Sequence, residues 1–136
     1  MRRHKVVPHA ADLAVELAAS SLEELFAAAL EGLGGLICPE AAPEEEERIS
    51  ADGEPDEELL VALLSEAIFL FETQRFVPAK ASVRLPAPGK AEATLLGETL
   101  DLARHFPRHA VKAATYHGLR IRRDGDIFKA RVIFDV

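Results

Sequence analysis

The feature that most constrains this fold is the segment 59–71, which is hydrophobic almost all the way round a helix. Asp56 is a plausible N-cap for it, with Glu57 and Glu58 favourably placed near the positive end of the helix. Such a helix must be covered by other elements on most of its surface. It is too short, and too interrupted by Ser65-Glu66, to span a membrane. We therefore predict a buried central helix around which the rest of the chain folds.

A strand and a second helix are predicted before it. Residues 12–18 alternate between hydrophobic and other residues, the pattern of a half-buried strand. Ser21 and Glu24 then form a capping box, in which the serine oxygen accepts the N3 amide and the glutamate reaches back. Hydrophobic residues follow at helical spacing, and we expect this helix to end at Gly34-Gly35.

The remaining elements are predicted to be strands. We expect a short strand at 48–51 after an acidic loop at 39–47, and further on a series of alternating segments with two turns between them. The later strands and turns are 81–85, a turn at 86–89, 91–95, 111–116, 119–122, a turn at Asp124-Gly125, and 127–134. Helices early and hairpins late indicate an α+β fold, a single domain over 1–136 with two main helices packed on antiparallel β-sheet.

Charge and cysteine content exclude several classes of protein. The net charge of −7 argues against simple wrapping of nucleic acid, so no DNA partner is expected. Residues 104–136 nevertheless carry 8 basic and 3 acidic side chains, which either lie on solvated strand faces or meet an anionic partner. Cys38 is the only cysteine, so no disulfide and no cysteine-held zinc are expected. The first residues do not read as a secretory signal, and we expect a cytoplasmic protein with no membrane contact.

One group of carboxylates could bind a metal ion. No glycine-rich phosphate loop, serine nucleophile elbow or histidine metalloprotease motif is present in the sequence. Asp135 lies beside the terminal α-carboxylate of Val136, and Asp12 would add a third carboxylate if the last strand lies near the start of the first. Calcium or magnesium would suit such a cluster. By themselves, however, these residues favour a plainer interpretation, in which Asp12 caps a turn and Asp135 is a solvated strand end.

Other polar residues at the ends of elements are weaker candidates. The five histidines invite a metal or acid-base interpretation, but their spacing is poor for it. His117 alternates with Thr115 on a predicted strand, which favours a hydrogen-bonded structural role. Arg104 and Lys112 could contact phosphate, although an isolated cation is usually solvated.

Several short motifs, in order along nearly the whole chain, make the sequence resemble the archease family. The matching pieces are His9-Ala10-Ala11-Asp12, Ser21-Leu22-Glu23-Glu24-Leu25-Phe26, Phe69-Leu70-Phe71-Glu72, Phe76-Val77-Pro78, Gly97-Glu98, Val111 to Leu119, and Arg131-Val132-Ile133-Phe134-Asp135-Val136. Each piece alone is weak, but their order and spacing are specific. Position 10 is alanine where many relatives have threonine, so any role of that hydroxyl is absent here.

The resemblance implies a function and a set of sites. Archeases are accessory proteins that activate an RtcB-type tRNA-splicing RNA ligase, promoting its guanylylation and multiple turnover without catalysing a reaction themselves. The family's metal site falls on Asp12, Asp135 and Val136, the cluster that charge reasoning proposes, and calcium is the expected ion, with magnesium as the alternative. For ligase activation we expect Arg104, His105, Lys112 and His117. The partner is then the ligase, and tRNA is met indirectly through it.

Two other classes of function stay open on the sequence. A metal-dependent hydrolase or transferase would use Asp12 and Asp135 directly and would need a general base, for which His105 or His117 is available. A free-standing RNA-binding protein or chaperone would instead use the basic last third of the chain. Turnover or RNA binding by the pure protein, without any ligase, would distinguish these alternatives.

Overall fold

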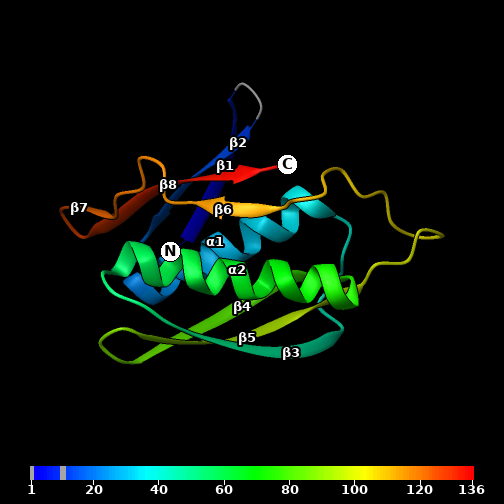
Figure 1. Ribbon diagram of the computed structural model, residues 1–136, viewed down its shortest axis with the longest axis horizontal. Coiled ribbons are helices and arrows are strands. Elements are labelled where there is room, and N and C mark those ends of the chain that lie inside the picture. Colours follow the sequence, from blue (N-terminus) through cyan, green and yellow to red (C-terminus); the bar gives the residue numbers. More distant parts are fainter. Residues whose placement is uncertain (1, 10–11) are drawn as a thin grey trace.

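The computed structural model describes residues 2–9 and 12–136 and contains two helices between two antiparallel sheets (Figure 1). The elements, in chain order, are β1 (Arg2–His9), β2 (Asp12–Ala19), α1 (Leu22–Ile37), β3 (Glu45–Asp52), α2 (Asp56–Gln74), β4 (Phe76–Ala87), β5 (Lys90–Thr99), β6 (Ala113–Thr115), β7 (Arg122–Asp124) and β8 (Ile127–Asp135). The predicted α+β class, with two main helices on antiparallel sheet, is confirmed.

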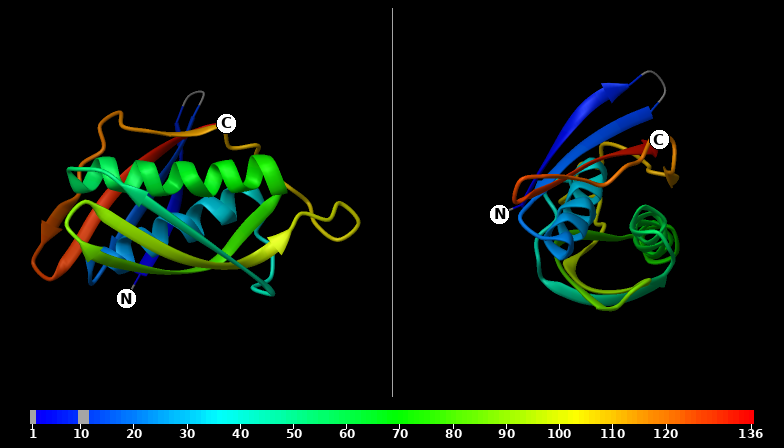
Figure 2. Two further views of the ribbon diagram at one scale, coloured as in Figure 1. Left: turned by 60° about the horizontal axis from the view of Figure 1, so that its bottom comes forward. Right: turned by 90° about the vertical axis from the view of Figure 1, so that its left-hand side faces the viewer.

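The two sheets form the outer layers and the helices form the middle one (Figure 2). Sheet A has the order β1-β2-β8-β6, with β7 also paired to β8, and sheet B has the order β3-β5-β4. Helix α1 packs against β1, β2 and β4, whereas α2 packs mainly against β3. Buried side chains such as Val15 and Val132 of sheet A and Ala93 and Leu95 of sheet B face the helices, and exposed charged residues lie on the opposite side of each sheet.

Helix α1 begins as predicted but ends later. The Ser21 side chain accepts a hydrogen bond from the Glu24 amide at 3.1 Å, which confirms the capping interaction at its start. The predicted end at Gly34-Gly35 is wrong, because the helix continues to Ile37. A Cβ atom on Gly34 would lie 1.6 Å from the carbonyl oxygen of Pro78 in β4. This glycine therefore allows close packing of helix on strand instead of ending the helix.

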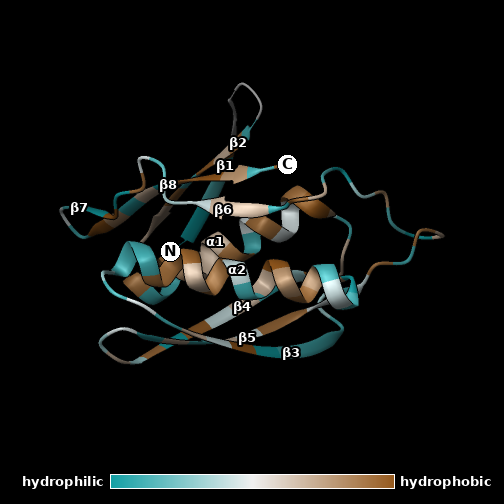
Figure 3. Ribbon diagram, viewed as in Figure 1, coloured by the Kyte–Doolittle hydropathy of each residue, from teal (hydrophilic) through white to brown (hydrophobic). Residues whose placement is uncertain are grey.

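Helix α2 is the buried central helix that the sequence predicts. Its middle is hydrophobic and its two ends are hydrophilic (Figure 3). The N-cap is Pro55 and not Asp56, and it makes no side-chain capping bond. The helix ends at Gln74, and its C-cap, Arg75, has a left-handed φ of 59°. In the part of the chain that the structure describes, neither helix is both long and apolar enough to cross a bilayer.

Several strand predictions need correction. Strand β1 was not expected, and its pairing with β2 places the first residues of the chain in sheet A. The loop predicted at 39–47 is too long, because β3 already begins at Glu45. The 81–85 and 91–95 hairpin is confirmed as β4 and β5. The strand predicted at 111–116 is shorter in the structure, where it is β6 (Ala113–Thr115). The strand predicted at 119–122 is wrong, because the next strand, β7, begins only at Arg122.

Candidate functional site

Two carboxylates lie side by side at one end of sheet A. Asp12 begins β2 and Asp135 ends β8, and these two residues are direct partners in the antiparallel register. Such partners have Cα atoms about 4.5–5.5 Å apart. Asp12 is half-buried and Asp135 is exposed. The juxtaposition required for the predicted metal cluster is therefore present.

Alternation along the strands decides which face carries this pair. Val15 of β2 and Val132 of β8 are register partners and are fully buried against the helices. Residues an odd number of positions away point to the other side of the sheet. Asp12 and Asp135 are both three positions away, so they lie on the outer face of sheet A.

The backbone next to Asp135 is fixed at this acidic end. Val136 follows Asp135 directly and is 37% exposed, so its expected α-carboxylate would lie beside the two aspartates. The Asp135 carbonyl oxygen accepts a hydrogen bond of 2.8 Å from the Lys112 amide, which fixes the strand end. Among the described residues no three His, Cys, Asp or Glu side chains gather as a metal-binding group. A cation here would thus need the terminal carboxylate in addition to the two aspartates, an all-oxygen set that suits calcium or magnesium.

The hairpin before Asp12 belongs to the same end of the sheet. His9 is the register partner of Asp12 in the β1–β2 pairing. Ala10 and Ala11, which complete the His9-Ala10-Ala11-Asp12 motif, lie outside the described residues.

A second polar cluster centres on Glu98, at the end of β5, whose side chain is only 4% exposed. Its Oε1 atom accepts hydrogen bonds from the Ala42 amide at 2.8 Å and from His105 Nε2 at 3.1 Å. Its Oε2 atom accepts one from Arg104 at 2.8 Å. These bonds, led by that from Ala42, lower the pKa of Glu98 from 4.5 to about 2. Sequence reasoning named Glu98 only as part of a motif, because nothing in its neighbourhood predicts burial.

His105 is a buried part of this network. Its Nδ1 atom accepts a hydrogen bond of 2.8 Å from the Asp101 amide, so the ring proton is on Nε2 and points to Glu98. The side chain is 2% exposed. In this conformation His105 cannot touch a partner; it holds the loop that carries Arg104.

Arg104 is the outward-facing member of the cluster. It donates to Glu98 at 2.8 Å and to Asp101 at 3.1 Å, yet its side chain remains 58% exposed. The bonds to these two carboxylates raise the pKa of the guanidinium. Leu102 and Phe106 flank it, and both are more than 70% exposed. The loop at 100–112 thus presents an oriented cation close in sequence to two exposed hydrophobic side chains, and a second arginine, Arg108, pairs with Glu40 at 2.9 Å.

The last two predicted residues occupy different places. Lys112 is exposed and lies just before β6, and its amide is the donor to Asp135 already described. It therefore connects the loop with the acidic end. His117 lies in a turn after β6 ends at Thr115, so the prediction that it alternates with Thr115 on a strand is wrong. Its amide donates to Thr115 Oγ1 at 3.4 Å, and its side chain is exposed.

Comparison with known proteins agrees with this architecture. The model of the archease protein family matches residues 4–136. The archease of Thermococcus gammatolerans is 33% identical over 128 residues, which is 90% of each chain. The solution structure of Methanobacterium thermoautotrophicum protein 1598 is 26% identical and covers 98% of both chains with a TM-score of 0.75. A crystal structure from Thermotoga maritima, described as an archease and possible chaperone, shares the fold with a TM-score of 0.64 at 23% identity. The chain thus belongs to the archease protein family.

Proposed function

We propose that this protein activates an RtcB-type tRNA-splicing RNA ligase, promoting its guanylylation and multiple turnover, and that it catalyses no reaction itself. Membership of the archease family supports this proposal. We further propose that Asp12, Asp135 and the terminal carboxylate of Val136 bind one hard divalent cation, calcium or magnesium. The single observation that carries the site is the direct pairing of Asp12 with Asp135 on an open sheet face.

An accessory role also agrees with the state of the buried polar groups. Glu98 and His105 are hydrogen-bonded to one another, and their side chains are only 4% and 2% exposed, so both are shielded from a reacting molecule in this conformation. A metal ion bound at Asp12 and Asp135 would lie on the outer face of sheet A, next to the exposed end of β8. A bound ion there would supply positive charge and oriented oxygen ligands at a contact surface.

The loop at 100–112 supplies the proposed contact with the ligase. Aromatic residues and arginine are enriched in protein–protein interfaces, and arginine is also enriched among the residues that contribute most to binding. Phe106 is 73% exposed and Arg104 is oriented by the buried Glu98, with the exposed Leu102 as a neighbour in the same loop. Lys112 and His117 lie further along the same surface segment, and we propose them as secondary contacts.

The test is guanylylation of a cognate ligase by GTP, followed in the absence and presence of this protein. Substoichiometric amounts should accelerate guanylylation and multiple-turnover RNA joining. Equal rates with and without the protein would refute the proposal. Turnover of nucleotide or RNA by the pure protein would instead support a metal-dependent hydrolase or transferase, and RNA binding with no effect on any ligase would support a chaperone.

A further inference from the structure

A hollow of about 820 Å³ lies on the outer face of sheet A, beyond the acidic end. Its charged lining consists of six cations and two carboxylates: Arg3, Lys5, Arg122, Arg123, Lys129 and Arg131, with Glu16 and Asp124. We call this surface the basic field. The whole chain has a net charge of −7, so the basic field has the opposite sign of charge from the molecule as a whole.

The register of sheet A arranges these cations in two rows across the strands. One row passes through the partners Arg3, Ala18, Lys129 and Arg122, and the other through Lys5, Glu16 and Arg131. The rows are two residues apart along each strand, or roughly 6.7 Å. The result is a mainly cationic surface several strands wide, too broad for one small anion, in which Glu16 lies between Lys5 and Arg131.

Most of these cations have no ionic partner. Within the described ranges 2–9 and 12–136, Lys129 pairs with Asp124 at 3.3 Å, whereas Arg3, Lys5, Arg122 and Arg131 make no ion pair. The inward-facing neighbour Arg2 is different, since it pairs with Glu24 at 2.7 Å and Glu31 at 2.9 Å.

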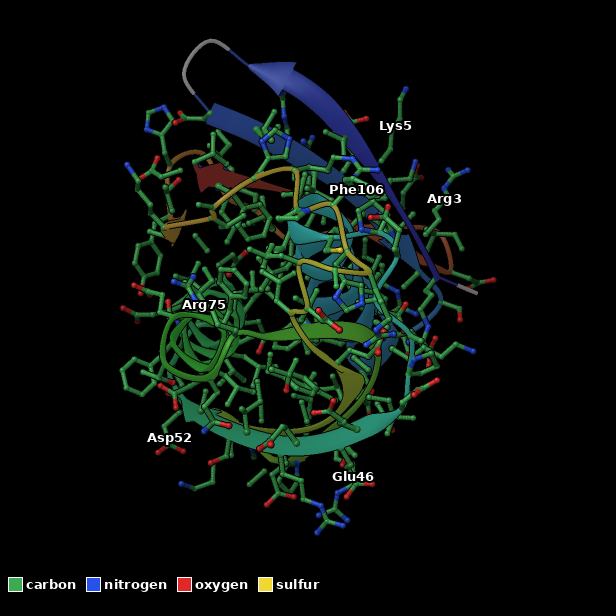
Figure 4. All side chains as sticks on the ribbon, turned by 90° about the vertical axis from the view of Figure 1, so that its right-hand side faces the viewer. Arg3, Lys5, Glu46, Asp52, Arg75 and Phe106 are labelled. Atoms are coloured by element: carbon green, nitrogen blue, oxygen red, sulfur yellow. The ribbon has the colours of Figure 1, made fainter. Side chains whose placement is uncertain are left out.

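The outer face of sheet B provides the contrast. Three of the four cations on its strands are paired with carboxylates, Arg84 with Glu92 at 2.6 Å, Lys90 with Asp52 at 3.0 Å and Arg48 with Glu46 at 3.4 Å, and Lys80 is the exception among the described residues. In Figure 4, Arg3 and Lys5 extend outward from β1, while Glu46 and Asp52 lie on the opposite side of the molecule. Like charges gathered on one sheet face repel one another, and an external polyanion would relieve that repulsion.

We propose that the basic field binds the phosphate backbone of single-stranded RNA. The choice of RNA among polyanions rests on the proposed function, since the ligase acts on RNA ends. Phe128 is the aromatic residue nearest these cations by register, and it is half-buried beneath Arg123, so no ring is presented for base stacking. Binding should therefore be independent of base sequence. The field also shares its face with the acidic end, because Arg131 is four residues, or roughly 13 Å, from Asp135 along β8.

The experiment measures binding of a fluorescein-labelled single-stranded RNA by anisotropy over a series of salt concentrations. Four phosphate contacts predict a slope of log K against log salt of about −2.8, which is about a 50-fold loss of affinity between 50 and 200 mM salt. The double variant Arg122→Gln/Arg131→Gln should reduce the magnitude of this slope by about 1.4, because it removes two phosphate contacts. The matched control, Arg48→Gln/Arg84→Gln, removes the same charge from sheet B and should leave the slope unchanged. Melting curves verify that both variants are folded.

Ligase guanylylation without RNA separates the two proposals. We expect the basic-field variant to stimulate guanylylation as well as the wild type does. Equal RNA binding by the wild type and both variants would overturn the RNA site while leaving ligase activation intact. If the basic-field variant alone fails to stimulate guanylylation in the absence of RNA, this surface contacts the ligase protein. That result would also overturn the proposed RNA site. Failure of the wild type to stimulate guanylylation would overturn the proposed function, whatever the RNA result.

Discussion

Replacing Asp135 with asparagine should change stability in opposite directions without and with a divalent cation. Without the ion, Asp12 and Asp135 are two negative charges on paired residues. At about 5 Å in water they repel by about 0.8 kcal/mol, and by roughly half of that at physiological salt. Asp135→Asn removes this repulsion. For 136 residues, with about 2.1 cal/mol/K of unfolding entropy per residue, the melting temperature should rise by about 1.5–3 °C.

With the ion present the order should reverse. A cation at about 100 times its dissociation constant stabilises the wild type by about 2.7 kcal/mol, or about 9 °C on the same scale. The variant, which lacks one ligand, should gain little, so the wild type should melt about 6–8 °C higher. Extension of the chain beyond Val136 should abolish most of the gain by moving the terminal carboxylate away.

Scanning calorimetry at neutral pH, in EDTA and then in calcium or magnesium, measures this reversal. Asp126→Asn is the matched control, because it removes an exposed carboxylate from the turn before β8, far along the strand from Asp135. If wild type and Asp135→Asn keep the same order in both conditions, or if Asp126→Asn behaves like Asp135→Asn, the proposed metal site is refuted.

Three further predictions concern the core and the loop. Gly34→Ala should destabilise the fold by about 1–3 kcal/mol in denaturant titrations, because its Cβ would meet the Pro78 carbonyl, whereas Gly35→Ala, with its nearest neighbour at 3.8 Å, should be neutral or stabilising. A similar loss in both would contradict this. Glu98 has a lowered pKa, so the free energy of unfolding should fall as pH drops from about 4.5 towards 2. Glu98→Gln should make this fall shallower, as measured by urea midpoints at several pH values. An unchanged pH dependence in the variant would contradict the role of Glu98. Arg104→Ala should slow ligase guanylylation measured well below its melting temperature, which should itself fall because buried Glu98 loses its 2.8 Å partner; full activation would exclude Arg104 from the contact.

The elements with strong local signals were predictable from the sequence. The serine cap of α1, the all-round hydrophobic α2 and the Asp124-Gly125 turn were placed correctly, because each depends on neighbouring residues alone; the Glu24 side chain, which was expected to reach back to the cap, pairs with Arg2 instead. Gly34 was misread as a helix end, since its role depends on a strand more than forty residues away. Strand β1 was missed because a basic, proline-containing segment becomes a strand only through its pairing with β2.

The candidate site, like the fold, was predictable only where neighbouring residues carried the signal. Adjacent charges at Asp135 and Val136 pointed to the acidic end, and the pairing with Asp12 brings together residues that charge reasoning could only assume to be close. The hydrogen-bond network of Glu98 was not predictable, because its partners come from a distant loop at Ala42 and from the 100–112 segment. Burial of His105 has the same origin.

Strand β8 pairs with β2, β6 and β7 and is thus central to sheet A. On the ribosome, residues 127–135 emerge after every other element, so sheet A must wait for them, with β1 and β2 already made. The β4–β5 hairpin, which is local in sequence, needs no such delay. During synthesis the β2 edge that later receives β8 is exposed, and exposed edges favour wrong pairing. Since Asp12 meets Asp135 only when β8 has docked, the acidic end forms only when sheet A is assembled.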